Sequence, residues 1–100
     1  MTYHLVRIVL FIFTSFGCYA QNITGKVLDS KTSEALPFAN VFLNNTTIGT
    51  VTDTNGEFNL DVKESGNYEL VFSYVGYESY KMKVVVGEET LSIGTIKLVP

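Results

Sequence analysis

Several chemically important residue types are missing from most of this sequence. Its 100 residues contain no tryptophan, and the single histidine and cysteine, His4 and Cys18, both lie among the first 20. The single arginine, Arg7, lies there too. From Gln21 onward the chain therefore has no ligands for a usual zinc or copper site, no cysteine nucleophile, no Ser–His pair and no disulfide. These absences argue against catalysis.

The charge of the chain is low and negative. Beyond residue 20, six lysines are set against ten acidic residues, which gives a formal charge of −4. A mildly acidic surface without arginine argues against a nucleic acid as partner. Hydrophobic residues make up 46% of the chain and charged residues 17%, so we expect it to fold, as one small domain.

The only long apolar run lies at the N-terminus. His4 and Arg7 precede the mostly apolar stretch IVLFIFTSFG, and Cys18-Tyr19-Ala20 follows it. This order predicts a secretory signal peptide over residues 1–20, cleaved after Ala20. A membrane span is the alternative, but about ten apolar residues fall short of the roughly 20 that a span needs. Lipidation of Cys18 is a second alternative, which Ser15-Phe16 fits poorly.

From Gln21 onward, apolar side chains recur with a period of two residues. Such alternation predicts β-strands with one buried face, and the breaks between the runs are rich in Gly, Asn, Asp and Ser. Many short strands at regular spacing predict a two-sheet antiparallel sandwich for residues 21–100. The seven expected strands are residues 23–28, 38–43, 48–52, 58–62, 68–75, 77–86 and 91–98.

The stretch TVTDTNGEFNL, residues 50–60, places acids, an amide and a glycine between two expected strands. Counted from Asp53, its glycine is fourth where a calcium-binding EF-hand loop needs it sixth, and the twelfth residue, Glu64, lies past an expected strand, so that geometry fails. We interpret it as a structural turn: Asp53 accepts backbone hydrogen bonds, Asn55-Gly56 reverses the chain and Phe58 enters the core. A weak calcium site is the alternative.

Paired carboxylates are a second alternative for this region. Asp53 with Glu57, and Glu88 with Glu89, have the residue type that glycoside hydrolysis uses. Neither pair has a neighbouring Arg or His that would separate the two pKa values, as acid–base work requires. We interpret both pairs as solvated acids of turns.

Tyrosines gather in the stretch YVGYESY, residues 74–80. Tyr74, Tyr77 and Tyr80 form a candidate interaction surface, since exposed tyrosines can stack on a sugar or bind a partner protein. The simpler alternative is that Tyr74 and Tyr77 pack at the edge of the sandwich, with Gly76 bending the chain between them.

Four segments together resemble a known family: ITGKVLD at 23–29, LPFANV at 36–41, GTVTDTNGEF at 49–58 and LVFSYVGY at 70–77. Their order and spacing resemble the carboxypeptidase regulatory-like domain of exported Bacteroidetes proteins. The resemblance implies a transthyretin-like (prealbumin-like), all-β, seven-stranded antiparallel Greek-key sandwich. It also implies that Asp53, Gly56 and Phe58 form a structural corner, and that the domain itself is not a peptidase.

The same resemblance suggests what the chain does. Such domains often stand at the N-terminus of SusC-like TonB-dependent receptors of the outer membrane, whose plug and barrel are not in this sequence. We therefore expect a non-catalytic exported module, in the periplasm or at the outer membrane of a Gram-negative bacterium, with no cofactor or metal. Its expected partner is a protein or the following domains of the same polypeptide. The alternative is a glycan-binding module that uses Tyr74, Tyr77 and Tyr80, although the tryptophans of usual sugar platforms are missing.

Overall fold

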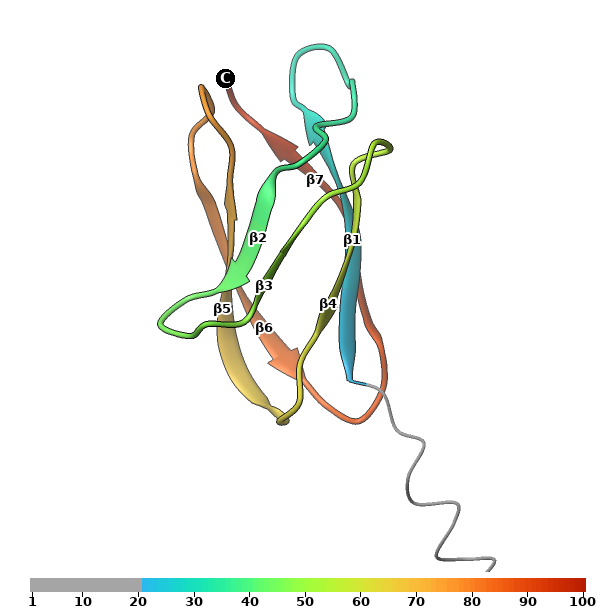
Figure 1. Ribbon diagram of the computed structural model, residues 1–100, viewed down its shortest axis with the longest axis vertical. Coiled ribbons are helices and arrows are strands. Elements are labelled where there is room, and N and C mark those ends of the chain that lie inside the picture. The colour runs from blue at the N-terminus through green and yellow to red at the C-terminus, as the bar shows by residue number, and fades with distance from the viewer. Residues whose placement is uncertain (1–20) are drawn as a thin grey trace, which may run out of the picture.

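The computed structural model describes residues 21–100, which form seven strands in two facing sheets (Figure 1). The signal peptide and Cys18 lie outside the described residues and stay predictions. The all-β class and the number of strands are confirmed. The strands are β1 (Asn22–Asp29), β2 (Asn40–Leu43), β3 (Gly49–Val51), β4 (Glu57–Asp61), β5 (Gly66–Ser73), β6 (Tyr80–Val86) and β7 (Leu91–Leu98).

One sheet has three strands in the order β4-β1-β7, and the other has four in the order β3-β2-β5-β6. Neighbouring strands are antiparallel with one exception: β1 and β7 run parallel, with a register shift between Thr24 and Lys26. This pair differs from the fully antiparallel arrangement that we expected. The Greek-key pattern of connections stays a prediction.

The core lies between the two sheets, and the alternation of each strand determines which side chains reach it. In β4 the apolar Phe58 and Leu60 are buried, while Glu57, Asn59 and Asp61 are exposed. The pairing of β2 with β5 aligns Val41 with Phe72 and Leu43 with Leu70, and all four side chains are fully buried. Removal of this apolar surface from water is the main force that holds the sheets together.

Two strands begin two or more residues later than the sequence predicts. β2 starts at Asn40 rather than Phe38, because Phe38 has a φ of 62°, which no strand residue adopts. β6 starts at Tyr80 rather than Tyr77, because Tyr77 donates its N–H to Tyr74 O (3.1 Å) and so closes a turn.

Three loops and the end of the chain lie together at one end of the sandwich (Figure 1). They are residues 30–39, 52–56, 74–79 and 99–100, and we call them the C-terminal tip. The backbone joins two of these segments, since Glu78 donates its N–H to Val99 O (2.8 Å).

Within residues 21–100, no helix is long and apolar enough to cross a membrane.

Candidate functional site

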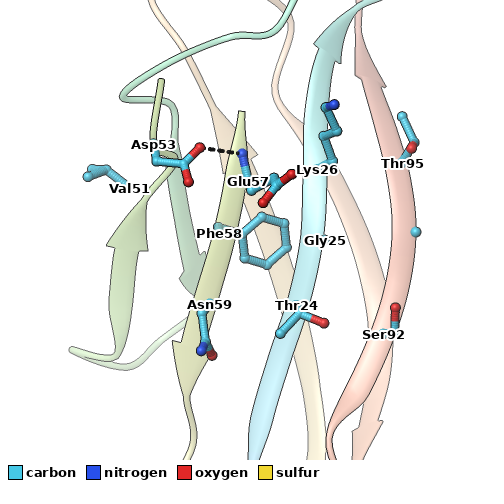
Figure 2. A pocket seen from close by; sticks show the side chains of 11 residues that line it. Thr24, Gly25, Lys26, Val51, Asp53, Glu57, Phe58, Asn59, Ser92 and Thr95 are labelled. Atoms are coloured by element: carbon cyan, nitrogen blue, oxygen red, sulfur yellow. Dashed lines mark hydrogen bonds between the residues drawn. The ribbon is translucent and has the colours of Figure 1, made fainter. Parts of the chain in front are cut away.

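The residues from Asp53 to Glu57 form a closed turn between β3 and β4. Asp53 Oδ1 accepts hydrogen bonds from the backbone N–H groups of Asn55 and Glu57, both at 2.9 Å. Figure 2 shows the bond from Glu57. The backbone adds Gly56 N–H to Asp53 O (3.0 Å) and Asp53 N–H to Glu57 O (2.8 Å). One carboxylate thus supports the whole turn, as aspartates at the start of tight turns commonly do.

Gly56 brings this turn against the neighbouring strand β1. Its φ is 76°, and its carbonyl oxygen accepts the N–H of Val27 at 2.8 Å. A Cβ atom at this position would lie 2.5 Å from the carbonyl oxygen of Val27. Only glycine fits here, both for its conformation and for the space that it leaves.

Phe58 follows the turn and enters the core. Its ring lies over Gly25 of β1, where a Cβ atom would come within 2.8 Å of Phe58 Cε1 (Figure 2). The ring also meets Phe72 edge to face, with centroids 5.7 Å apart and an interplanar angle of 69°. The sequence identifies Phe58 as a core residue but gives no sign that its ring packs on Gly25.

An open hollow of about 640 Å³ lies beside the turn, across β4, β1 and β7 (Figure 2). Most of the residues that line it have polar side chains, and Lys26 of β1 stands opposite Glu57 of β4 in the strand register. In the described residues, no three His, Cys, Asp or Glu side chains gather as a metal site would require. The chemistry available in the hollow is hydrogen bonding and charge.

The three candidate tyrosines have different environments. Tyr74 and Tyr77 are half-buried against the core, and their ring centroids are 5.5 Å apart at an interplanar angle of 46°. Tyr80 is exposed at the start of β6, and its ring lies 6.1 Å from that of the buried Phe72. The rings of Tyr74 and Tyr77 are tilted, and so do not form one flat stacking platform.

Tyr77 has a partner that the sequence pattern does not indicate. Its hydroxyl donates a hydrogen bond to Asp29 Oδ2, although 48 positions separate the two residues. Asp29 is largely buried at the end of β1, and its Oδ1 accepts the N–H groups of Lys31 (2.7 Å) and Thr32 (3.1 Å). This carboxylate therefore connects the loop after β1 with the loop after β5.

The hydrogen bonds shift the pKa of both side chains. The hydrogen bond from Tyr77 makes the largest contribution to lowering the pKa of Asp29, and the hydrogen bonds from the two backbone N–H groups lower it further. The Asp29 hydrogen bond and then burial raise the pKa of Tyr77. Each group is thus held in the protonation state that keeps the contact: carboxylate for Asp29 and neutral phenol for Tyr77.

Replacing Tyr77 with phenylalanine should destabilise the domain most near neutral pH. Because the folded-state pKa of Asp29 is below its unfolded value of about 3.9, its stabilisation is complete above that value and is lost as the pH falls through the folded-state pKa. Because the folded-state pKa of Tyr77 is above about 10, its contribution is lost as the pH rises through that higher pKa. The difference in Tm between wild type and Y77F, followed by circular dichroism, should therefore narrow at both extremes of pH.

The matched control is Tyr74→Phe. Tyr74 is half-buried beside Tyr77, but in the described residues its hydroxyl makes no hydrogen bond to the Asp29 carboxylate. Its effect on Tm should not vary with pH in this way. If Y77F and Y74F gave parallel pH profiles, the Asp29 contact would not be the source of the effect.

Comparison with known proteins gives the family. A model of the CarboxypepD_reg-like domain matches residues 23–98. The TonB-dependent receptor SusC of Bacteroides thetaiotaomicron is 36% identical over 81 residues, which cover 80% of this chain and 8% of the receptor. The TonB-dependent receptor P3 of Formosa agariphila is 33% identical over 84 residues, which cover 79% of this chain and 8% of that receptor. This chain thus spans about 8% of the length of these curated relatives.

Solved structures share the fold at low sequence identity. A chain of a type II cohesin–X–dockerin complex from Acetivibrio cellulolyticus matches with a TM-score of 0.65 and 17% identity, over 79% of this chain and 56% of that one. The 5-hydroxyisourate hydrolase of Klebsiella pneumoniae matches with a TM-score of 0.61 and 18% identity, over 80% of this chain and 90% of that one. These matches confirm the expected transthyretin-like sandwich. Since the family model spans most of its length, the chain belongs to the CarboxypepD_reg-like domain family.

Proposed function

We propose that this chain is a non-catalytic module of an outer-membrane protein of the TonB-dependent receptor type, and that it acts by binding other protein parts. The observation that carries the proposal is the similarity to two such receptors over about four-fifths of the chain. The proposed location is the periplasm or the outer membrane of a Gram-negative bacterium, reached through the predicted signal peptide.

The residue inventory supports a role without catalysis. Residues 21–100 contain no histidine, cysteine or arginine. The acid at the turn is engaged in structure, because Asp53 Oδ1 accepts two backbone N–H groups. The hydrogen bond from Tyr77 lowers the pKa of Asp29, so this carboxylate is not free to take up a proton at neutral pH. General acid–base catalysis works best with a group whose pKa lies near the working pH.

The proposed role as a module of a TonB-dependent receptor can be tested by putting this chain in place of the matched stretch of a relative. Residues 22–98 would replace the matched stretch of SusC in Bacteroides thetaiotaomicron, and receptor in the outer-membrane fraction would be measured by immunoblot. We expect the chimera to reach a level near that of the native receptor, and a receptor without the stretch to fall well below it. A chimera with Gly56→Ala, which we expect to destabilise the fold, is the matched control. If the deletion had no effect, or the folded chimera did no better than the deletion, the shared role would be wrong.

An assay of hydrolysis tests the absence of catalysis separately. The full chain should show no turnover of 5-hydroxyisourate above the spontaneous rate, in spite of the fold that it shares with the hydrolase. The reason is that a shared fold does not carry the residues of an active site. Ultraviolet absorbance follows the reaction, with the Klebsiella pneumoniae enzyme as positive control. A rate that rose with the concentration of this chain would contradict the prediction.

A further inference from the structure

Large apolar side chains are exposed at the C-terminal tip, where polar loop residues would be expected. In the described residues, the exposed fractions are 67% for Phe38, 94% for Val75 and 45% for Val99. They come from three different segments of the tip. An apolar group shared among separate loops is typical of a surface that contacts another molecule.

The backbone brings these three residues to the same end of the sandwich. Asn40 of β2 pairs with Ser73 of β5, so Phe38 and Val75 both lie two residues beyond the last pair, on neighbouring segments. Val99 is held beside the loop of Val75, because Glu78 donates its N–H to Val99 O at 2.8 Å. The apolar group therefore rests on paired backbone.

Phe38 is held in a conformation that its residue type rarely adopts. Its φ of 62° lies in the left-handed region, which is uncommon for any residue with a side chain and most unusual for a bulky one. A φ of this kind that the surroundings impose is a mark of functional sites. The strain is not offset by burial of the ring, since two-thirds of the side chain is exposed.

Buried Thr52 is what imposes this conformation. Its hydroxyl accepts the N–H of Ala39 (2.9 Å) and donates to Leu36 O, while its carbonyl oxygen accepts the N–H of Phe38 (3.0 Å). One fully buried residue thus secures the chain on both sides of Phe38. The aromatic ring is presented to solvent in a fixed position, as a preorganised anchor would be.

The charged side chains exposed on the same loops, which we call the rim, are mostly acidic. The exposed charges of the three loops are Glu34, Asp53 and Glu78, against one lysine, Lys31. A negative rim disfavours an anionic membrane surface and favours a partner with positive groups at matching positions.

We propose that the C-terminal tip is a protein-docking surface in which Phe38, flanked by Val75 and Val99, enters an apolar pocket rimmed by lysine and arginine. The proposal rests on the proposed function, which it deepens by naming the surface and the chemistry of the partner. Aromatic anchors surrounded by polar residues carry most of the binding energy at protein interfaces.

Photo-crosslinking of the full chain in the cells that carry its gene tests this surface. The probe is p-benzoylphenylalanine, placed in one variant at Phe38 and in another at Val85. Val85 is the matched control, because it is 70% exposed but lies at the opposite end of the same sheet, paired with Asn67. We expect one discrete protein adduct from position 38 and none from position 85, with the crosslinked partner peptide, read by mass spectrometry, apolar and flanked by lysine or arginine.

A second pair of variants separates binding from folding. With the probe at Val75, Phe38→Asn should reduce the yield of the protein adduct at least fivefold. The double substitution E34K/E78K should reduce it as much, because it reverses the charge of the rim. Asparagine accepts the left-handed φ more readily than phenylalanine does, so F38N should have a Tm equal to or above that of the wild type. A lower Tm for F38N would mean that Phe38 serves stability, and would overturn the proposal.

The other outcomes are equally decisive. Adducts only with a second copy of the chain, or only with lipid, would overturn the proposal in favour of self-association or membrane contact. Protein adducts from position 85 but not from position 38 would leave the proposed binding role intact and move its surface elsewhere. If neither position gave a protein adduct, the docking surface would be wrong, and the exchange with the matched stretch of SusC would still decide the proposed function.

Discussion

Replacing Gly56 with alanine should lower the free energy of unfolding by about 3 kcal/mol or more. A left-handed conformation costs a residue with a Cβ atom roughly 1–2 kcal/mol. The new methyl group would in addition lie 2.5 Å from the carbonyl oxygen of Val27, and Val27 is fully buried between the sheets. Relief of that contact would break the hydrogen bond from Val27 N–H to Gly56 O and separate the turn from β1. For a domain of this size the loss corresponds to a fall in Tm of about 10–20 °C.

Substitutions at two other glycines separate the conformational cost at Gly56 from the cost of its contact with Val27. Gly76 has a φ of 85°, but a Cβ atom there would meet no other part of the protein within 4 Å, so Gly76→Ala should cost only the conformational part, about 1 kcal/mol. Gly87 is equally open and lies outside the left-handed region, so Gly87→Ala should change stability by no more than about 0.5 kcal/mol. Urea unfolding followed by circular dichroism measures all three. Equal losses for G56A and G76A would show that the contact with Val27 has no part in the effect.

The fold was predictable because alternation is a local signal that both sheets obey. The stretch EFNLD shows this directly: Phe58 and Leu60 are buried and the residues between them are exposed, as the pattern predicts. The parallel pairing of β1 with β7 was not predictable in the same way, because the alternation of two strands is the same whether they run parallel or antiparallel. The start of β2 was misplaced for a different reason: the φ of Phe38 is imposed by Thr52, 14 positions further along the chain.

The candidate sites likewise differ in whether their contacts join residues that are close in the sequence or far apart. Hydrogen bonds within the Asp53 turn join residues two to four positions apart, so turn chemistry in the sequence was enough to suggest them. The contact between Asp29 and Tyr77 depends on two loops that meet only in the folded sandwich. The seat of Phe58 on Gly25 likewise joins β4 to β1, across 33 positions of sequence. A single sequence carries no signal for such pairs.

Replacing Phe58 with alanine should destabilise the domain by about 3–5 kcal/mol, the usual cost of truncating a buried phenylalanine. The ring is 5% exposed, meets Phe72 edge to face and covers the backbone of β1 at Gly25. Its removal leaves a cavity between the three-stranded sheet and the core, which the paired strands cannot collapse to fill. Phe58→Leu should cost less, since it keeps part of the volume. The midpoint of urea unfolding measures both variants, and a loss below about 1 kcal/mol for F58A would show that the ring is not a core anchor.

The seat of the ring can be tested by a double-mutant cycle with Gly25. In the native protein Gly25→Ala should cost about 1–3 kcal/mol, because its methyl group would lie 2.8 Å from Phe58 Cε1 and 2.9 Å from Ile93 Cγ1. In the F58A background the first obstacle is gone and the methyl group enters the cavity, so the same substitution should cost at least about 1 kcal/mol less. The matched control is Gly66→Ala on β5, whose nearest neighbours are atoms of Tyr68 at 3.5 Å or more, and its cost should be the same in both backgrounds. Strictly additive costs for G25A and F58A would mean that the ring does not rest on Gly25. Coupling confined to that pair would show that the absence of a side chain at Gly25 of β1 makes room for the ring of Phe58.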